Sequence, residues 1–127
     1  MTVYETEDQR QPNEGGAEGY LHISVAAARR ALPVFDAVIS IYANIAETEA
    51  DLLAILQTDA GGETETITLP APLPVNSQVP GGEPPYNVYY AKIVAPNYIT
   101  QDQVPIQIFP GVVSALIINL LPPPDNM

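Results

Sequence analysis

Prolines and glycines interrupt this chain so often that a helical fold is excluded. The 127 residues include 14 prolines and 8 glycines, too scattered for a collagen repeat. Inside a helix a proline removes a backbone hydrogen bond and clashes with the preceding turn, whereas turns and edge strands accept it. The apolar runs between these residues are short enough for strands. Together with a length that suits one domain, this pattern predicts a single all-β sandwich.

The central segment, residues 52–72, predicts a β-hairpin. Its first half is apolar and strand-like, and Asp59, Gly61 and Gly62 then supply residues suited to a turn. Residues 66–69 alternate between threonine and an apolar residue before Pro70 and Pro72 end the run. We therefore expect the two halves to pair with each other.

Five further segments have the composition of strands: residues 20–25, 37–45, 86–95, 104–109 and 114–121. Alternation predicts which of their side chains point into the core: Leu21, Ile23, Val25, Ile39, Ile41, Ala43, Tyr89, Ala91, Ile93, Ala95, Leu116, Ile118 and Leu120. Residues 26–32 are expected to form a connection, residues 47–51 an acidic loop, and residues 70–85 a long surface loop.

The charge of the chain excludes several classes of partner. Fifteen acidic residues against four basic ones give a net charge of −11, which repels phosphate backbones and anionic membranes. We therefore expect no binding to nucleic acid. No apolar run reaches membrane-spanning length, so we expect no membrane insertion. The absence of cysteine excludes disulfides and thiolate metal ligands.

The N-terminal segment differs in composition from the rest of the chain. Residues 1–18 are polar and acidic, which is typical of a disordered tail. The alternative is an extended arm that packs on a neighbouring copy of the chain, since so few apolar residues cannot order themselves. We divide the chain into an arm at residues 1–18, a sandwich at 19–122 and a tail at 123–127. The first ten residues lack a basic start followed by an apolar stretch, so we expect no Sec signal peptide.

Two late strands carry apolar residues on the face that should meet solvent. Val88, Tyr90 and Val94 surround Lys92 on one of them, and Ile117 lies on the last strand with Leu121 at its end. Exposed apolar faces of this kind indicate contact with another protein. The predicted subunit interface comprises Val3, Tyr4, Val88, Tyr90, Val94, Ile117 and Leu121.

The order of these segments resembles the carboxypeptidase-regulatory-like family over residues 19–121. The most specific pieces are the turn Thr58-Asp59-x-Gly61 and the corner Ala95-Pro96-x-Tyr98, where this chain has Asn97 in place of the family's usual glycine. The resemblance implies a transthyretin-like, Cna-B-like β-sandwich of about seven strands. Domains resembling this one are common in spore-forming Firmicutes and generally have structural or accessory roles.

Two activities of related sandwiches do not match these residues. An intramolecular isopeptide bond of the Cna-B type needs a lysine on the first strand, but that strand has His22 and Ser24, and Lys92 lies elsewhere. The transthyretin-like hydroxyisourate hydrolases need several histidines and arginines and a characteristic C-terminus, which this chain lacks. We expect neither activity.

No residue pattern predicts catalysis, a metal or a cofactor. His22 is the only histidine, it alternates out of phase with the core, and the sequence shows no hydroxyl and acid beside it. Two sets of alternating carboxylates could bind calcium, but solvated acidic loops explain them better. These sets are Glu47, Glu49 and Asp51, and Asp59, Glu63 and Glu65. We therefore expect a protein that is not an enzyme.

These expectations favour a structural protein. It would be a self-assembling subunit of an extracellular or spore-associated filament or layer, with the N-terminal arm packing on a neighbouring subunit. The alternative is a soluble accessory domain that binds peptidoglycan or another glycan of the cell wall through Tyr86, Tyr89, Tyr90 and Tyr98, because aromatic rings stack on sugars. Either role predicts a location outside the cell, at the cell surface or at the spore surface.

Overall fold

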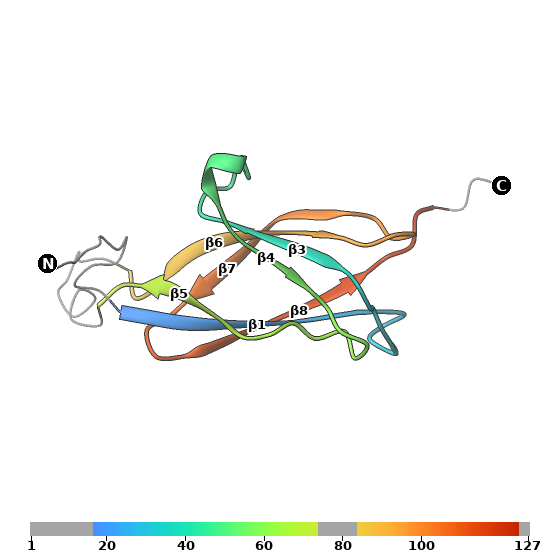
Figure 1. Cartoon of the computed structure of the whole chain (residues 1–127), viewed down its shortest axis with the longest axis horizontal. Helices are drawn as coiled ribbons and strands as arrows, with labels where there is room; N and C mark the ends of the chain where they lie inside the picture. Colours follow the sequence, from blue (N-terminus) through green and yellow to red (C-terminus); the bar gives the residue numbers. More distant parts are fainter. Residues whose placement is uncertain (1–16, 74–83, 125–127) are drawn as a thin grey trace, which may run out of the picture.

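Two β-sheets face each other in the computed structural model, which describes residues 17–73 and 84–124 (Figure 1). In this part of the chain, the only helical element is one 3₁₀ turn, η1 (Glu49–Asp51), so no helix could cross a membrane. The strands are β1 (Ala17–Ala27), β2 (Leu32–Pro33), β3 (Val38–Tyr42), β4 (Leu52–Gln57), β5 (Ile67–Ala71), β6 (Asn87–Val94), β7 (Gln101–Ile108) and β8 (Val113–Leu120). The fold confirms the predicted all-β sandwich, and β1 begins two residues before the predicted domain boundary.

Sheet A is built around β1. Along one edge β1 pairs antiparallel with β5 and then, at its C-terminal end, with β2. Along the other edge it pairs in parallel with β8, from Tyr20 opposite Val113 to Ala27 opposite Leu120. The first and last strands of the sandwich are therefore neighbours, which ties the two ends of the domain together.

Sheet B is antiparallel throughout, in the order β4-β3-β6-β7. In its centre Ile39 lies opposite Ile93 and Ile41 opposite Ala91. Pro105 lies on β7, an edge strand, where a residue without an N–H group leaves no ladder hydrogen bond unmade.

The core lies between the sheets, and 11 of the 19 buried apolar residues in the described part of the chain are predicted inward positions. The other eight are Ala27, Val34, Ala37, Leu56, Leu69, Ala71, Ile106 and Ile108. Of the predicted set, only Ala43 and Leu116 are not buried: Leu116 is half-buried against the core, and Ala43 is exposed. The prediction for Ala43 was wrong because the pairing register shifts after Ile41 and β3 ends at Tyr42, which breaks the alternation. The predicted faces of β1, β6 and the end of β8 are confirmed.

The predicted hairpin does not form, because β4 and β5 belong to different sheets. A turn is present where expected: the N–H of Gly62 donates to the carbonyl of Asp59 at 2.9 Å, and Gly62 has a φ of +78°. After this turn, however, the N–H of Thr64 donates to the carbonyl of Ile23 on β1. The chain thus crosses from sheet B to sheet A, and β5 extends through Pro70 and Ala71 into the predicted surface loop.

Two short motifs from the sequence have the geometry expected of them. The hydroxyl of Thr58 is buried, donating to the carbonyl of Val34 at 2.7 Å and accepting from the N–H of Ala37 at 2.9 Å. Asn97 has a φ of +71°, which glycine adopts freely and asparagine tolerates better than most residues. Thr58 therefore fixes the crossing, and Asn97 forms the corner between β6 and β7.

Candidate functional site

The outer face of sheet B is apolar across three strands. Ladder pairing places Val38 beside Val94, and Tyr42 beside Tyr90. Ile55 on the edge strand β4 is 61% exposed, and no described element covers this side of the sheet. We call this surface the B face: Val38, Tyr42, Leu53, Ile55, Val88, Tyr90 and Val94, with the polar residues Ser40, Gln57 and Lys92 among them.

A second apolar surface lies on the outer side of sheet A, along β8. Val113 is 58% exposed and Ile117 is 50% exposed. Leu121, directly after β8, is 55% exposed. We call Val113, Ala115, Ile117 and Leu121 the A strip. Because the core lies between the two sheets, the A strip and the B face point away from each other.

The predicted interface residues are therefore divided between two surfaces. Val88, Tyr90 and Val94 belong to the B face, and Ile117 and Leu121 belong to the A strip. Val3 and Tyr4 lie outside the described residues. The described members of the predicted interface therefore do not form one continuous surface. Sequence reasoning also missed Leu53, Ile55 and Val113, although the alternation of residues 52–57 carries the signal for the first two.

His22 has a carboxylate and two hydroxyls around it, which corrects the expectation from the sequence. Its Nε2 lies 2.6 Å from Oε1 of Glu63, and Ser24 donates its hydroxyl to the same oxygen at 2.6 Å. Thr66 Oγ1 lies 3.4 Å from His22 Nδ1. Ser24 thus bonds the acid rather than the imidazole, and Thr66 is at the outer limit of hydrogen bonding. The cluster's clearest effect is to tie the segment after the Gly62 turn to β1.

Glu63 is held in its ionised form. The hydrogen bond from Ser24 is the main cause that lowers the pKa of the Glu63 carboxyl, and the hydrogen bond from His22 is the next. An ionised carboxylate only accepts hydrogen bonds, so His22 donates to it through Nε2. The imidazole, when neutral, then has Nδ1 free to accept from Thr66.

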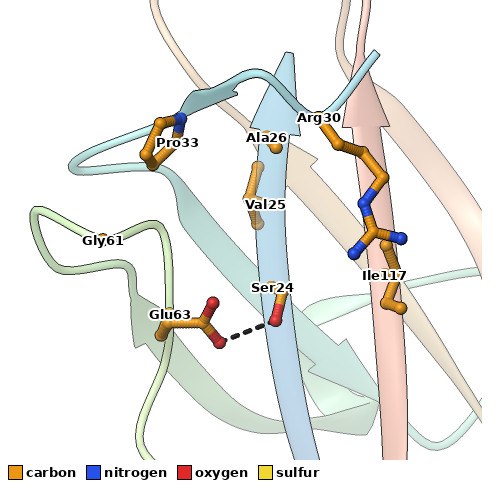
Figure 2. Close-up of a pocket in the computed structure, with 8 residues that line it drawn as sticks. All are labelled: Ser24, Val25, Ala26, Arg30, Pro33, Gly61, Glu63 and Ile117. Carbon is orange, nitrogen blue, oxygen red and sulfur yellow. Dashed lines mark hydrogen bonds between the residues drawn. The ribbon is translucent and has the colours of Figure 1, made fainter.

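A cavity of about 140 Å³ opens on the outer side of sheet A next to this cluster (Figure 2). Ser24, Glu63, Arg30 and Ile117 are among the residues that line it. Figure 2 shows the Arg30 side chain extending along β8 so that its guanidinium lies beside Ile117, while Glu63 lies on the other side of β1. The cavity therefore combines a cation, an anion and part of the A strip.

In the two sets of carboxylates considered as calcium ligands, several side chains accept hydrogen bonds that stabilise the loops. Glu47 accepts a hydrogen bond from the N–H of Gln103 at 2.8 Å, and Asp51 accepts one from the hydroxyl of Thr48. Asp59 Oδ1 accepts from the N–H groups of Gly61 and Glu63. Within residues 17–73 and 84–124, no group of three or more histidine or acidic residues is placed to hold a metal ion.

The four tyrosines weighed for sugar binding do not share one surface. Tyr89 is in the core, where burial raises the pKa of its hydroxyl and the carbonyl of Pro70 accepts its hydrogen bond at 2.7 Å. Tyr98 packs against the core, and the ring of Tyr86 lies 5.3 Å from that of Phe109. Of the four, only Tyr90 lies on the B face.

No protein-family model matches the sequence, and no curated protein matches it significantly. The comparison with solved structures does find similar folds. They include the TIE protein of Bacillus anthracis, with 14% identity, a TM-score of 0.54, and coverage of 84% of this chain and 17% of that one. The minor pilin GBS52 of Streptococcus agalactiae has 14% identity, a TM-score of 0.59, and coverage of 88% and 48%.

A third similar structure is an enzyme, 3-chlorocatechol 1,2-dioxygenase of Rhodococcus opacus 1CP. It has 13% identity and a TM-score of 0.60, and the match covers 89% of this chain and 63% of the dioxygenase. In each case the chain spans less than two thirds of the protein it resembles. At these identities the similarity shows only the class of fold, a β-sandwich shared with a minor pilin, the TIE protein and a dioxygenase, and no activity.

Proposed function

We propose that this chain is a non-catalytic structural protein that assembles with copies of itself into a filament or layer outside the cell, at the cell or spore surface. The observation that carries the proposal is the pair of exposed apolar surfaces, the B face and the A strip, on opposite sides of one sandwich. Monomeric proteins rarely leave large apolar patches uncovered, because each Å² of apolar surface removed from water contributes about 25 cal/mol.

Two different surfaces are what a propagating contact needs. When the B face of one subunit packs on the A strip of the next, the A strip of the first subunit and the B face of the second stay free to bind further subunits. Such a head-to-tail contact adds subunits until it closes into a ring, or continues as a fibre. Sheets that pack face to face in this way stack about 10 Å apart, as they do inside a sandwich.

The minor pilin among the similar structures supports a structural role, since a pilin is a component of a surface fibre. The dioxygenases carry the same sandwich, so the fold alone does not select a function. The surfaces of this chain, rather than its fold, are therefore the basis of the proposal.

Substitution of one residue on each surface tests the contact. Ile55→Asp places a charge on the B face, and Ile117→Asp places one on the A strip. Ala60→Asp is the matched control, because Ala60 is exposed in the turn after β4 and belongs to neither surface. In sedimentation velocity and negative-stain electron microscopy, we expect the wild-type chain and Ala60→Asp to assemble and the Ile55→Asp and Ile117→Asp variants to remain small. Assembly of both isoleucine variants to the wild-type extent would contradict the proposal.

Mixing the Ile55→Asp and Ile117→Asp variants tests the head-to-tail arrangement. Each retains the surface that the other has lost, so an equimolar mixture should give one-to-one dimers that grow no further. If the contact instead joined identical surfaces, each variant alone would form dimers through its intact surface. A wild-type chain that stays monomeric at high concentration would favour the alternative role in glycan binding.

A further inference from the structure

The turn between β1 and β2 has an unusual backbone. Ala28, Arg29 and Arg30 have φ values of +52°, +57° and +74°, so three consecutive residues with side chains adopt the left-handed conformation. The N–H of Ala31 donates to the carbonyl of Ala28 at 3.1 Å, which closes the turn. For residues with a Cβ atom, the left-handed conformation is less favourable than the right-handed one. Strain of this kind persists where the surrounding structure holds it, often at binding sites.

This turn also concentrates positive charge on a strongly acidic protein. The whole chain has four basic residues and a net charge of −11. Arg29 and Arg30 are both exposed, and neither makes an ion pair or hydrogen bond with any residue in the described ranges. Arg30 reaches into the cavity beside Ile117, so the cation lies next to the A strip (Figure 2). The exposed cations of this turn thus favour the binding of an anionic partner.

The sequence of the chain itself contains such a partner. Residues 1–16 precede the described part of the chain and include Glu5, Glu7, Asp8 and Glu14, against one basic residue, Arg10. This segment joins β1 at Ala17, whereas the arginine turn follows the other end of β1 (Figure 1). An eleven-residue strand is about 36 Å long at roughly 3.3 Å per residue, so Ala17, where the segment is attached, lies at the opposite end of the sandwich from the arginine turn.

We propose that the acidic N-terminal segment of one copy binds the Arg29–Arg30 turn of the next copy. The inference rests on the proposed assembly and names a second contact within it. Because the segment is attached at the end of the subunit opposite the arginine turn, this contact also propagates head to tail. It lies beside the A strip, so it strengthens the same junction between subunits. Sixteen residues could span about 50 Å when extended, which is enough to reach a neighbour.

The charges that line the cavity also restrict which charges the bound segment can carry. Glu63 also lines it, so an incoming segment made only of carboxylates would be attracted by Arg30 and repelled by Glu63. The N-terminal segment carries both signs of charge, since Arg10 follows Glu7 and Asp8 in the sequence. Its composition therefore suits a cavity lined by Arg30 and Glu63 better than a purely acidic segment would.

A charge-reversal experiment on the full chain tests this contact. The double variant Arg29→Glu/Arg30→Glu should weaken association at least tenfold in low-salt sedimentation velocity. The arm variant Glu5→Lys/Glu7→Lys/Asp8→Lys should do the same. Combining all five substitutions restores opposite charges and should recover association. Glu49→Lys is the control, because it reverses an exposed charge in η1, outside the turn, the N-terminal segment and both apolar surfaces.

The results of these experiments distinguish a failure of the arm contact from a failure of the proposed assembly. If the wild-type chain associates and Ile55→Asp abolishes association, but the arginine variant associates normally, the assembly stands and the arm contact is wrong. Failure of the combined variant to recover association would also overturn it. A wild-type chain that stays monomeric overturns both. Recovery in the combined variant, lost again in 500 mM salt, would establish the charge pairing, since salt screens exposed ion pairs.

Discussion

Oε1 of Glu63 lies 2.6 Å from Nε2 of His22, although 41 positions separate the two residues in the chain. Ser24 donates to the same oxygen, so one carboxylate joins two outward-facing residues of β1 to the segment that has just crossed from sheet B. This segment then continues into β5, which pairs with the first half of β1. The contact therefore fixes where the crossing chain meets sheet A.

This contact predicts an acid-dependent component of stability. The pKa of Glu63 is lowered in the folded protein from its ordinary value of 4.5, first by Ser24 and then by His22. Its stabilising effect is therefore complete above pH 4.5 and is lost as the pH falls through the lower folded pKa. The side chains of His22 and Glu63 are 32% and 45% exposed, so we expect less than about 1 kcal/mol.

Thermal unfolding of the wild type and of Glu63→Gln between pH 3 and 7 measures this component. The two unfolding temperatures should differ most near neutral pH and converge in acid. Glu65→Gln is the control, because Glu65 is exposed two residues further along. Parallel pH profiles for the wild type and Glu63→Gln would show that the carboxylate contributes nothing through its charge.

Thr58→Val should lower the free energy of unfolding, although the two side chains have nearly the same size and shape. The substitution preserves the shape of the side chain but removes the hydroxyl that serves the carbonyl of Val34 and the N–H of Ala37, leaving both buried groups unpaired. We expect a loss of about 1–3 kcal/mol in the free energy of unfolding by urea denaturation. Thr68→Val, at an exposed position on β5, should change it by less than about 0.5 kcal/mol. Equal effects of the two substitutions would contradict the role assigned to Thr58.

The faces of the strands could be predicted from the sequence because alternation directly records which side is buried. Leu21, Ile23 and Val25 on β1, and Tyr89, Ala91 and Ile93 on β6, lie in the core as predicted. Local turn chemistry was also readable, as Asn97 and Gly62 have the positive φ expected of them.

The pairing partners of the strands could not be predicted in the same way. Alternation in residues 66–69 is the same whether β5 pairs with β4 or with β1, so the hairpin was wrong even though its turn exists. For the same reason Val94 and Ile117 could each be assigned to an outer surface, but not to opposite sides of the sandwich. The cluster around His22 depends on the same crossing, and no local pattern marks it.

Gly62→Ala should destabilise the protein more than Gly111→Ala. Both glycines have positive φ, +78° and +72°, so either alanine pays a backbone cost of roughly 1–2 kcal/mol. At Gly62 an added Cβ would also lie 2.4 Å from the carbonyl oxygen of Val25, whereas at Gly111 nothing lies within 4 Å. We expect the Gly62 variant to lose a further 1–3 kcal/mol or so in urea denaturation. Equal losses would mean that the crossing chain is not packed tightly on β1.

Two isoleucines of sheet B should separate stability from assembly. Ile93 is fully buried, so Ile93→Ala leaves a cavity and should cost about 2–5 kcal/mol in the free energy of unfolding. Ile55 is 61% exposed, so Ile55→Ala should change the stability of the monomer by less than about 0.5 kcal/mol. If the B face packs on a neighbour, the same Ile55→Ala variant should nevertheless associate more weakly in sedimentation velocity. A variant with unchanged stability and unchanged association would remove Ile55 from the proposed contact, because an exposed apolar side chain that no neighbour covers has nothing to lose on truncation.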